Sequence, residues 1–279
     1  MTAVSAPDKG LRRDAAARAR TRPAKQSGTS RLATVGLPVL AVVIIAALWW
    51  LATVLFEIPE YLVPGPQVVT GRLVELGPYL LQQTWVTLGE TLAGFVLSIL
   101  IGIPVAMAIA RFRVVELMIY PLLLAVNSVP KVAIAPILVV WMGFGQTPKI
   151  VMVILLCFFP IVLSTVSGLR STPSELVELS RSLDASNLQE FRKIRFRWAM
   201  PQIFVGLKNA ISLAVIGAVI AEFVGASSGL GFVIVQSGAS ADTALAFAAI
   251  VLLALISIVL FYLLVWLEKV LLPWAEENR

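Results

Sequence analysis

Histidine is absent from the 279-residue chain, and cysteine occurs once, at Cys157. Without histidine the chain lacks the commonest general base and the commonest metal ligand. A lone cysteine can form neither an internal disulfide nor a metal cluster, so we interpret Cys157 as a packed apolar residue. Charged residues make up only 14% of the chain, against about 25% in soluble domains. These shortages argue against a soluble enzyme.

The chain contains long apolar stretches in place of charged residues. The chain is 59% hydrophobic and its mean hydropathy is +0.92, which also excludes a disordered chain and a nucleic-acid-binding module. Because a helix of about 20 apolar residues crosses a bilayer, we expect an all-α membrane protein. Six membrane-spanning helices are predicted, at about residues 32–56, 88–110, 115–144, 149–169, 201–223 and 243–267.

The third apolar stretch is long enough to be one crossing or two, since Lys131 and three prolines interrupt it. With one crossing, 19 of the 22 basic residues fall on the same side of the membrane as the N-terminal segment. Basic residues mark the cytosolic side. We therefore predict six spans with both termini in the cytosol, and we interpret the net charge of +6 as a topology signal rather than a nucleic-acid footprint.

The segments outside the spans differ in composition. Residues 1–31 contain no Ile, Phe, Trp or Tyr, which predicts a disordered basic cytosolic tail. Residues 66–76 place apolar side chains at helical spacing, which predicts a short amphipathic helix along the outer interface. Residues 273–279 are predicted to be a short cytosolic C-terminus, and 170–200 to be a cytosolic loop.

Two helix-start signals stand in the loop 170–200. Thr172 with Glu175, and Ser186 with Gln189, each have the spacing of a capping box. Asp184-Ala185 lies between them as a turn. The loop is therefore predicted to form a helix–turn–helix hairpin. Connections between helices usually have about 2–8 residues. Because the loop 170–200 is much longer, we predict that a cytosolic partner binds to it.

The chain has no motif that could bind a nucleotide. The pattern G-x-x-x-x-G-K-[ST] is absent, and the glycine-rich segment Gly225–Gly231 has no lysine. If ATP hydrolysis drives the activity of this protein, another polypeptide must bind and hydrolyse the ATP.

The hairpin and several other segments, in order, resemble a known family. Glu178-Leu179-Ser180, Asp184, Phe191, Ile194 and Pro201 resemble the loop signature of ABC importer permeases. The segment from Asn127 to Gly145 resembles the third-span signature of the nitrate/sulfonate/taurine branch. Further similar segments are Phe159-Pro160, Gly168-Leu169, Gly206-Leu207-Lys208, Ala221-Glu222-Phe223 and Gly229-Leu230-Gly231. The similarity covers roughly residues 35–272.

The resemblance implies a type I importer-like permease, not an enzyme, in the bacterial cytoplasmic (inner) membrane. It implies a homodimer of permeases, a dimer of ABC ATPase subunits that bind ATP and Mg²⁺, and an extracytoplasmic solute-binding protein, with no cofactor in this chain. The residues that it implies for ATPase coupling are Glu178, Ser182, Asp184, Ala185, Phe191 and Ile194. The sequence departs from the family at Asp184, where Gly is usual, and at Arg197, where Pro is usual.

Four residues are candidates for the substrate pathway. Lys131 lies inside the third span, where a charge is costly and suggests function, here contact with a small anionic or polar organic solute. Alternatively, Lys131 pairs with Glu222 for stability. Asn127 and Ser128 bond between helices or contact solute. An ion-gradient-driven secondary transporter is the alternative function, although no duplicated halves are apparent.

Overall fold

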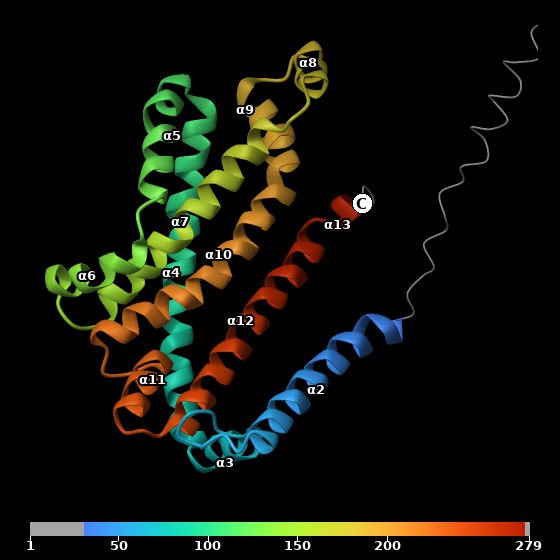
Figure 1. Ribbon diagram of the computed structural model, residues 1–279. Coiled ribbons are helices and arrows are strands. Elements are labelled where there is room, and N and C mark those ends of the chain that lie inside the picture. The colour runs from blue at the N-terminus through green and yellow to red at the C-terminus, as the bar shows by residue number, and fades with distance from the viewer. Residues whose placement is uncertain (1–30, 277–279) are drawn as a thin grey trace, which may run out of the picture. The chain divides into compact units, whose positions relative to one another are not determined.

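The structure is a computed structural model that describes residues 31–276 (Figure 1). All of the predicted tail except Arg31 lies outside the described residues, and so do the last three residues of the C-terminal segment. The chain divides into two compact units, residues 1–49 and 50–279. They are described separately.

Every regular element of the described residues is helical. Helix α2, Arg31–Leu55, lies mainly in the first unit. Four long helices form the body of the second unit: α4 (Gly77–Arg111), α7 (Gln146–Arg170), α10 (Phe196–Gly225) and α12 (Thr243–Leu271). The shorter helices are α3 (Pro66–Glu75), α5 (Arg113–Asn127), η1 (Lys131–Ile134), α6 (Ala135–Met142), α8 (Ser174–Ser182), α9 (Asn187–Gln189), η2 (Glu190–Arg195), α11 (Leu230–Ala239) and α13 (Pro273–Glu276).

Four or five membrane crossings are supported by the described helices, against the six predicted. Four helices are long and apolar enough alone, namely α4, α7, α12 and the continuous helical segment Asn187–Gly225. A fifth crossing is available if α5 and the η1–α6 segment count together. The predicted first span coincides with α2, whose apolar part Leu40–Leu55 falls short of a full crossing by the same measure.

The predicted third span is broken rather than straight. Its two halves, Arg113–Asn127 and Lys131–Met142, are bent by 84° relative to each other (Figure 1). Pro130 causes the break because it lacks an N–H and disfavours helical geometry at Val129. The last turn tightens, and the Val129 N–H donates to the Val126 carbonyl at 3.2 Å. Pro136 starts α6, where proline is tolerated.

Helix α7 lies at the centre of the second unit and packs against both α4 and α10. Small residues let the helices approach closely: a Cβ on Gly206 would lie 3.0 Å from the Pro160 carbonyl oxygen, and one on Gly217 would lie 3.1 Å from the Val153 Cα. The small residues of α10 therefore serve packing within the chain. Cys157 is fully buried there and its Sγ lies 3.2 Å from the Ala210 carbonyl oxygen, which confirms it as a packed residue.

The short elements gather at opposite ends of the second unit. Helices α8 and α9 lie at one end, and α3 and α11 lie at the other (Figure 1). Helix α10 joins the two ends, because α9, η2 and α10 form one continuous helical segment. The predicted helix at 66–76 is present as α3, whose Val69 is buried.

Candidate functional site

The predicted hairpin is present and turns at Asp184. Helix α8 ends there with the Asp184 N–H donating to the Arg181 carbonyl at 3.1 Å and the Ala185 N–H donating to the Ser180 carbonyl at 3.1 Å. This is the bonding pattern of a Schellman motif, whose turn residue is normally glycine. Asp184 has a φ of 55°. Aspartate tolerates this left-handed conformation better than most residues, so the fold of the turn survives the departure from glycine.

One of the two predicted capping boxes forms. The Gln189 N–H donates to Ser186 Oγ at 3.3 Å, and the Ser186 N–H donates to Gln189 Oε1 at 3.0 Å. The box at Thr172 was wrongly predicted, since α8 begins after Pro173 with no side-chain cap. The Thr172 hydroxyl instead donates to the Leu169 carbonyl at the end of α7, at 3.2 Å.

Glu190 anchors the hairpin to the long helix, and the sequence alone did not single it out. Its side chain is 5% exposed and accepts from Arg181 Nε of α8 at 3.1 Å and from Arg195 Nε at 2.8 Å. Burial opposes ionisation, but the bonds and charges of the two arginines outweigh it and lower the pKa of Glu190 below its ordinary value of 4.5. Glu190 is therefore a charged anchor at neutral pH.

The hairpin presents apolar side chains to its surroundings. Val177 packs inward, whereas Leu179, Leu183 and Leu188 are 57%, 75% and 73% exposed. The residues that were predicted for coupling fall into two groups. Glu178, Ser182 and Asp184 are exposed, and Ala185, Phe191 and Ile194 are half-buried.

Three of the four predicted pathway residues lie together at the break between α5 and η1. Lys131 Nζ donates to the Asn127 carbonyl at 3.0 Å and to Asn127 Oδ1 at 2.9 Å, and it lies 4.7 Å from the centroid of the Phe159 ring. The Ser128 hydroxyl donates to the Leu124 carbonyl at 3.2 Å. The hydrogen bonds of Asn127 and Ser128 are thus local, and the expectation of bonds between helices was wrong for them.

Glu222, the fourth residue, lies in a different cluster, at the α3 and α11 end. It is 1% exposed, and its carboxylate accepts from Thr87 Oγ1 at 2.7 Å and from the Gly231 N–H at 2.6 Å. The alternative in which Lys131 pairs with Glu222 is wrong, because each has other partners. A Cβ on Gly229, whose φ is 110°, would overlap the Glu222 carboxylate.

A buried ion pair adjoins Glu222. Lys149 Nζ of α7 lies 2.7 Å from Glu90 Oε1 of α4, and their side chains are 6% and 2% exposed. The sequence placed both residues at span ends and did not pair them. Opposite charges at the same end of neighbouring spans are the signal that could have found the pair.

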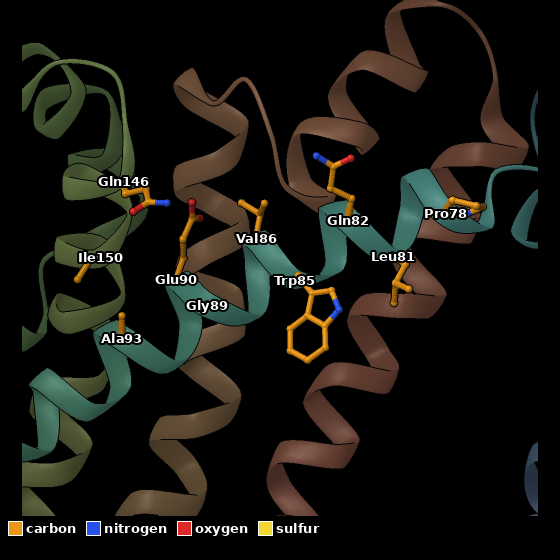
Figure 2. A pocket seen from close by; sticks show the side chains of 10 residues that line it. All are labelled: Pro78, Leu81, Gln82, Trp85, Val86, Gly89, Glu90, Ala93, Gln146 and Ile150. Carbon is orange, nitrogen blue, oxygen red and sulfur yellow. The ribbon is translucent and has the colours of Figure 1, made fainter.

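A groove of about 750 Å³ runs along α4 and reaches Glu90. Figure 2 shows Gln82, Trp85 and Val86 on α4, with Gln146 and Ile150 on α7 across from Glu90. Gln82, Trp85 and Gln146 are exposed, so the groove is open to the surroundings.

The long apolar helices are those of a membrane protein, and the anchored hairpin presents apolar side chains beyond them. The chain belongs to the family of binding-protein-dependent transport system inner membrane components, whose model matches residues 98–275.

Individual relatives agree with the family. The chain is similar to the riboflavin transport system permease protein RibX of Chloroflexus aurantiacus, at 35% identity over 86% of this chain and 90% of the relative. It is 30% identical to the taurine transport system permease protein TauC of Escherichia coli, over 89% of this chain and 92% of that one. Its fold resembles a chain of the MetNI methionine ABC transporter in inward-facing form, with a TM-score of 0.58, 22% identity and coverage of 70% and 94%.

The protein is therefore the permease component of a binding-protein-dependent ABC importer and a multi-pass inner membrane protein. It is a non-catalytic component of a complex that contains an ATPase. The resemblance to ABC importer permeases, including the taurine and sulfonate relatives, is confirmed. The ion-gradient-driven alternative is not supported.

Proposed function

We propose that this permease crosses the membrane six times, with both termini in the cytosol, and that two copies enclose the pathway for a small anionic or polar organic solute. The orientation rests on the basic residues, most of which fall on one side under this arrangement. The sixth crossing requires α2 to span the membrane as its uncharged sequence allows.

The α8–α9 hairpin docks on the ATPase subunit in this proposal. The observation that carries it is the combination of exposed leucines with a rigid anchor. Leu179, Leu183 and Leu188 offer apolar surface at an end that the basic residues assign to the cytosol. Glu190 fixes that surface to α10, so movement of the ATPase would be transmitted into the membrane segment.

An extracytoplasmic binding protein delivers the solute at the opposite end. Lys131 supports an anionic or carbonyl-bearing solute, since its ammonium group lies at a break in the helical backbone. The RibX and TauC relatives are named for riboflavin and for taurine, two chemically different compounds. We therefore propose that the partner binding protein selects the solute and that Lys131 contributes only a general preference.

Substitutions on the hairpin test the docking proposal. Glu178→Ala or Asp184→Lys should lower the yield of ATPase that co-purifies with the permease, and should lower transport in proportion, because both side chains are exposed on the hairpin. We expect a loss of about tenfold in affinity for the charge reversal, since like or unpaired charges at an interface cost about 1.4 kcal/mol or more.

Glu57→Lys is the matched control, since it makes the same change of charge at an exposed position that also has a positive φ, 46°, and lies far along the chain from the hairpin. It should leave co-purification unchanged. Unchanged ATPase association and transport in both hairpin variants would contradict the docking role.

A further inference from the structure

Three charged side chains are buried together where α4, α7 and α10 meet. Glu90, Lys149 and Glu222 are 3%, 5% and 1% exposed. Lys149 contacts two oxygens: its Nζ lies 2.7 Å from Glu90 Oε1 and 3.4 Å from the Ser228 carbonyl oxygen. The proposed transport mechanism does not use this cluster.

One carboxylate oxygen of the cluster, Glu90 Oε2, has no hydrogen-bond partner. Both oxygens of Glu222 accept a bond, one from Thr87 Oγ1 and one from the Gly231 N–H. Glu90 Oε1 accepts from Lys149, but Glu90 Oε2 is buried without a partner. Geometry places Glu222 next to Glu90: Glu222 bonds to Thr87, one turn before Glu90 on α4, and Lys149 joins Glu90 to the Ser228 carbonyl. A Cβ on Gly229, the residue after Ser228, would overlap the Glu222 carboxylate. An ionised carboxylate can only accept hydrogen bonds, so Glu90 Oε2 can donate to an acceptor in the cluster only if it carries a proton.

The charges of the cluster do not balance if both carboxyl groups are ionised. Lys149 supplies one positive charge against two negative charges, and an unpaired charge in a dry interior is costly. Among the described residues, α6, α11 and residues 226–229 contain no charged side chain, and the other charged residues of α4, α7 and α10 lie nearer the opposite ends of those helices. One added proton makes the cluster neutral and gives Glu90 Oε2 its missing bond.

We propose that Glu90 and Glu222 bind one proton between them, carried on Glu90 Oε2 and donated to the Glu222 carboxylate. The proton comes from bulk water and returns to it, so no other reactant is required. Glu90 is the carrier because Glu222 already uses both oxygens as acceptors. Glu90 lines the groove along α4, across from Gln146 (Figure 2), and in this proposal the groove is the route by which the proton reaches Glu90.

The shared proton fastens the start of α11 to α4. Glu222 holds the Gly231 N–H, and Thr87 Oγ1 donates to Glu222 while accepting from the Leu230 N–H at 2.8 Å. Gln83 Oε1 accepts from the Gly229 N–H at 2.7 Å. When the proton is lost, Glu90 becomes negatively charged next to the negatively charged Glu222. The repulsion between the two carboxylates then weakens the hydrogen bonds that hold the start of α11 on α4.

Infrared spectroscopy of the purified full-length chain in lipid nanodiscs tests the proposal directly. The wild type at neutral pH should show the C=O stretching band of a protonated carboxylic acid, shifted in D₂O. That band should be lost in both Glu90→Gln and Glu222→Gln, because removing either carboxyl group balances the charge of Lys149. Glu268→Gln is the control: Glu268 forms an ion pair with Lys208 at 2.7 Å and lies outside the cluster, so this variant should keep the band.

Thermal unfolding against pH supplies a second readout. The wild type should lose Tm as the pH rises and the proton leaves, whereas Glu90→Gln, whose amide N–H₂ mimics the protonated acid, should lose about 3 °C less. A wild-type spectrum without the band, a band that persists in both Gln variants, or equal alkaline loss of Tm would overturn the proposal. Neither measurement involves ATPase or solute, so the outcome is independent of the proposed transport role.

Discussion

Lys131 occupies a position in which a single side chain stabilises a broken helix and also offers a charge. Its ammonium group caps the exposed end of α5 through the carbonyl and the side chain of Asn127, and it lies over Phe159. Of its three donors, the Asn127 oxygens use two, and a Lys nitrogen has one more. In the proposed pathway, the remaining donor is the one that would bind the solute.

We predict that Lys131→Met lowers solute-stimulated ATPase activity about tenfold while changing basal ATPase activity much less, since a charge-assisted hydrogen bond to the solute is lost. The measurement is ATP hydrolysis by the reconstituted complex with and without loaded binding protein. Lys131→Arg keeps the charge and should retain most of the stimulation. Equal loss of basal and stimulated activity in Lys131→Met would assign the lysine to structure alone.

In the hairpin, contacts that depend only on local sequence spacing can be distinguished from contacts that depend on the tertiary fold. Ser186 and Gln189 close their capping box from local spacing alone, so the sequence was sufficient to predict it. Thr172 had the same spacing, but the end of α7 offered its hydroxyl another acceptor, the Leu169 carbonyl. The anchor at Glu190 could not be predicted, because it depends on how α8 folds back onto η2.

The same limit applies to the membrane helices. Uncharged runs indicated where α7 and α12 lie, because length and hydropathy are properties of the sequence itself. The Glu90–Lys149 pair was missed because a helix that is apolar on all sides gives no periodic signal for its rotation about its own axis. Without that rotation, the partners of a charge at a span end are undefined. Glu222 was singled out as a possible partner of Lys131, which is the wrong neighbour.

We predict that the hairpin loosens in acid. The pKa of Glu190 lies below its ordinary value of 4.5, so its contribution to stability is complete above that value and is lost as the pH falls through the lowered pKa. Hydrogen exchange of residues 174–189, corrected for the chemical exchange rate, should show constant protection near neutral pH and a decline in acid. Glu190→Gln should lose about fivefold in protection already at neutral pH.

Glu175→Gln provides the comparison, since Glu175 is an exposed residue of the first turn of α8. It should follow the wild-type profile. If hydrogen-exchange protection depends on pH in the same way in Glu190→Gln and in the wild type, the ion pairs of Glu190 with Arg181 and Arg195 do not stabilise the hairpin.

Cysteine labelling can test which side of the membrane each segment of the protein faces. Cys157 is fully buried, so an impermeant maleimide should not react with the wild type. Ser227 and Ser182 are exposed at opposite ends of the second unit. We predict that Ser227→Cys is labelled in intact cells, whereas Ser182→Cys and Ser5→Cys are labelled only in inside-out vesicles.

These three variants also decide the number of crossings. The N-terminal position should behave like the hairpin position, because an even number of spans returns the chain to the same side. Labelling of Ser5→Cys together with Ser227→Cys in intact cells would show that residues 32–56 do not cross, and five spans would then be correct.

The continuous helical segment Asn187–Gly225 has a consequence for how this permease responds to its surroundings. Its 39 residues extend for about 58 Å, roughly twice the thickness of the hydrocarbon layer. In the proposed orientation, the start of this segment with Glu190 lies on the cytosolic side, and its end with Glu222 lies on the external side; both carboxyl groups are buried. Cytosolic salt can screen the arginine pairs of Glu190 but does not reach the buried carboxyl pair, whereas external pH acts on the carboxyl pair alone. In the proposed orientation, one helix therefore carries ionic contacts at its two ends that face opposite sides of the membrane.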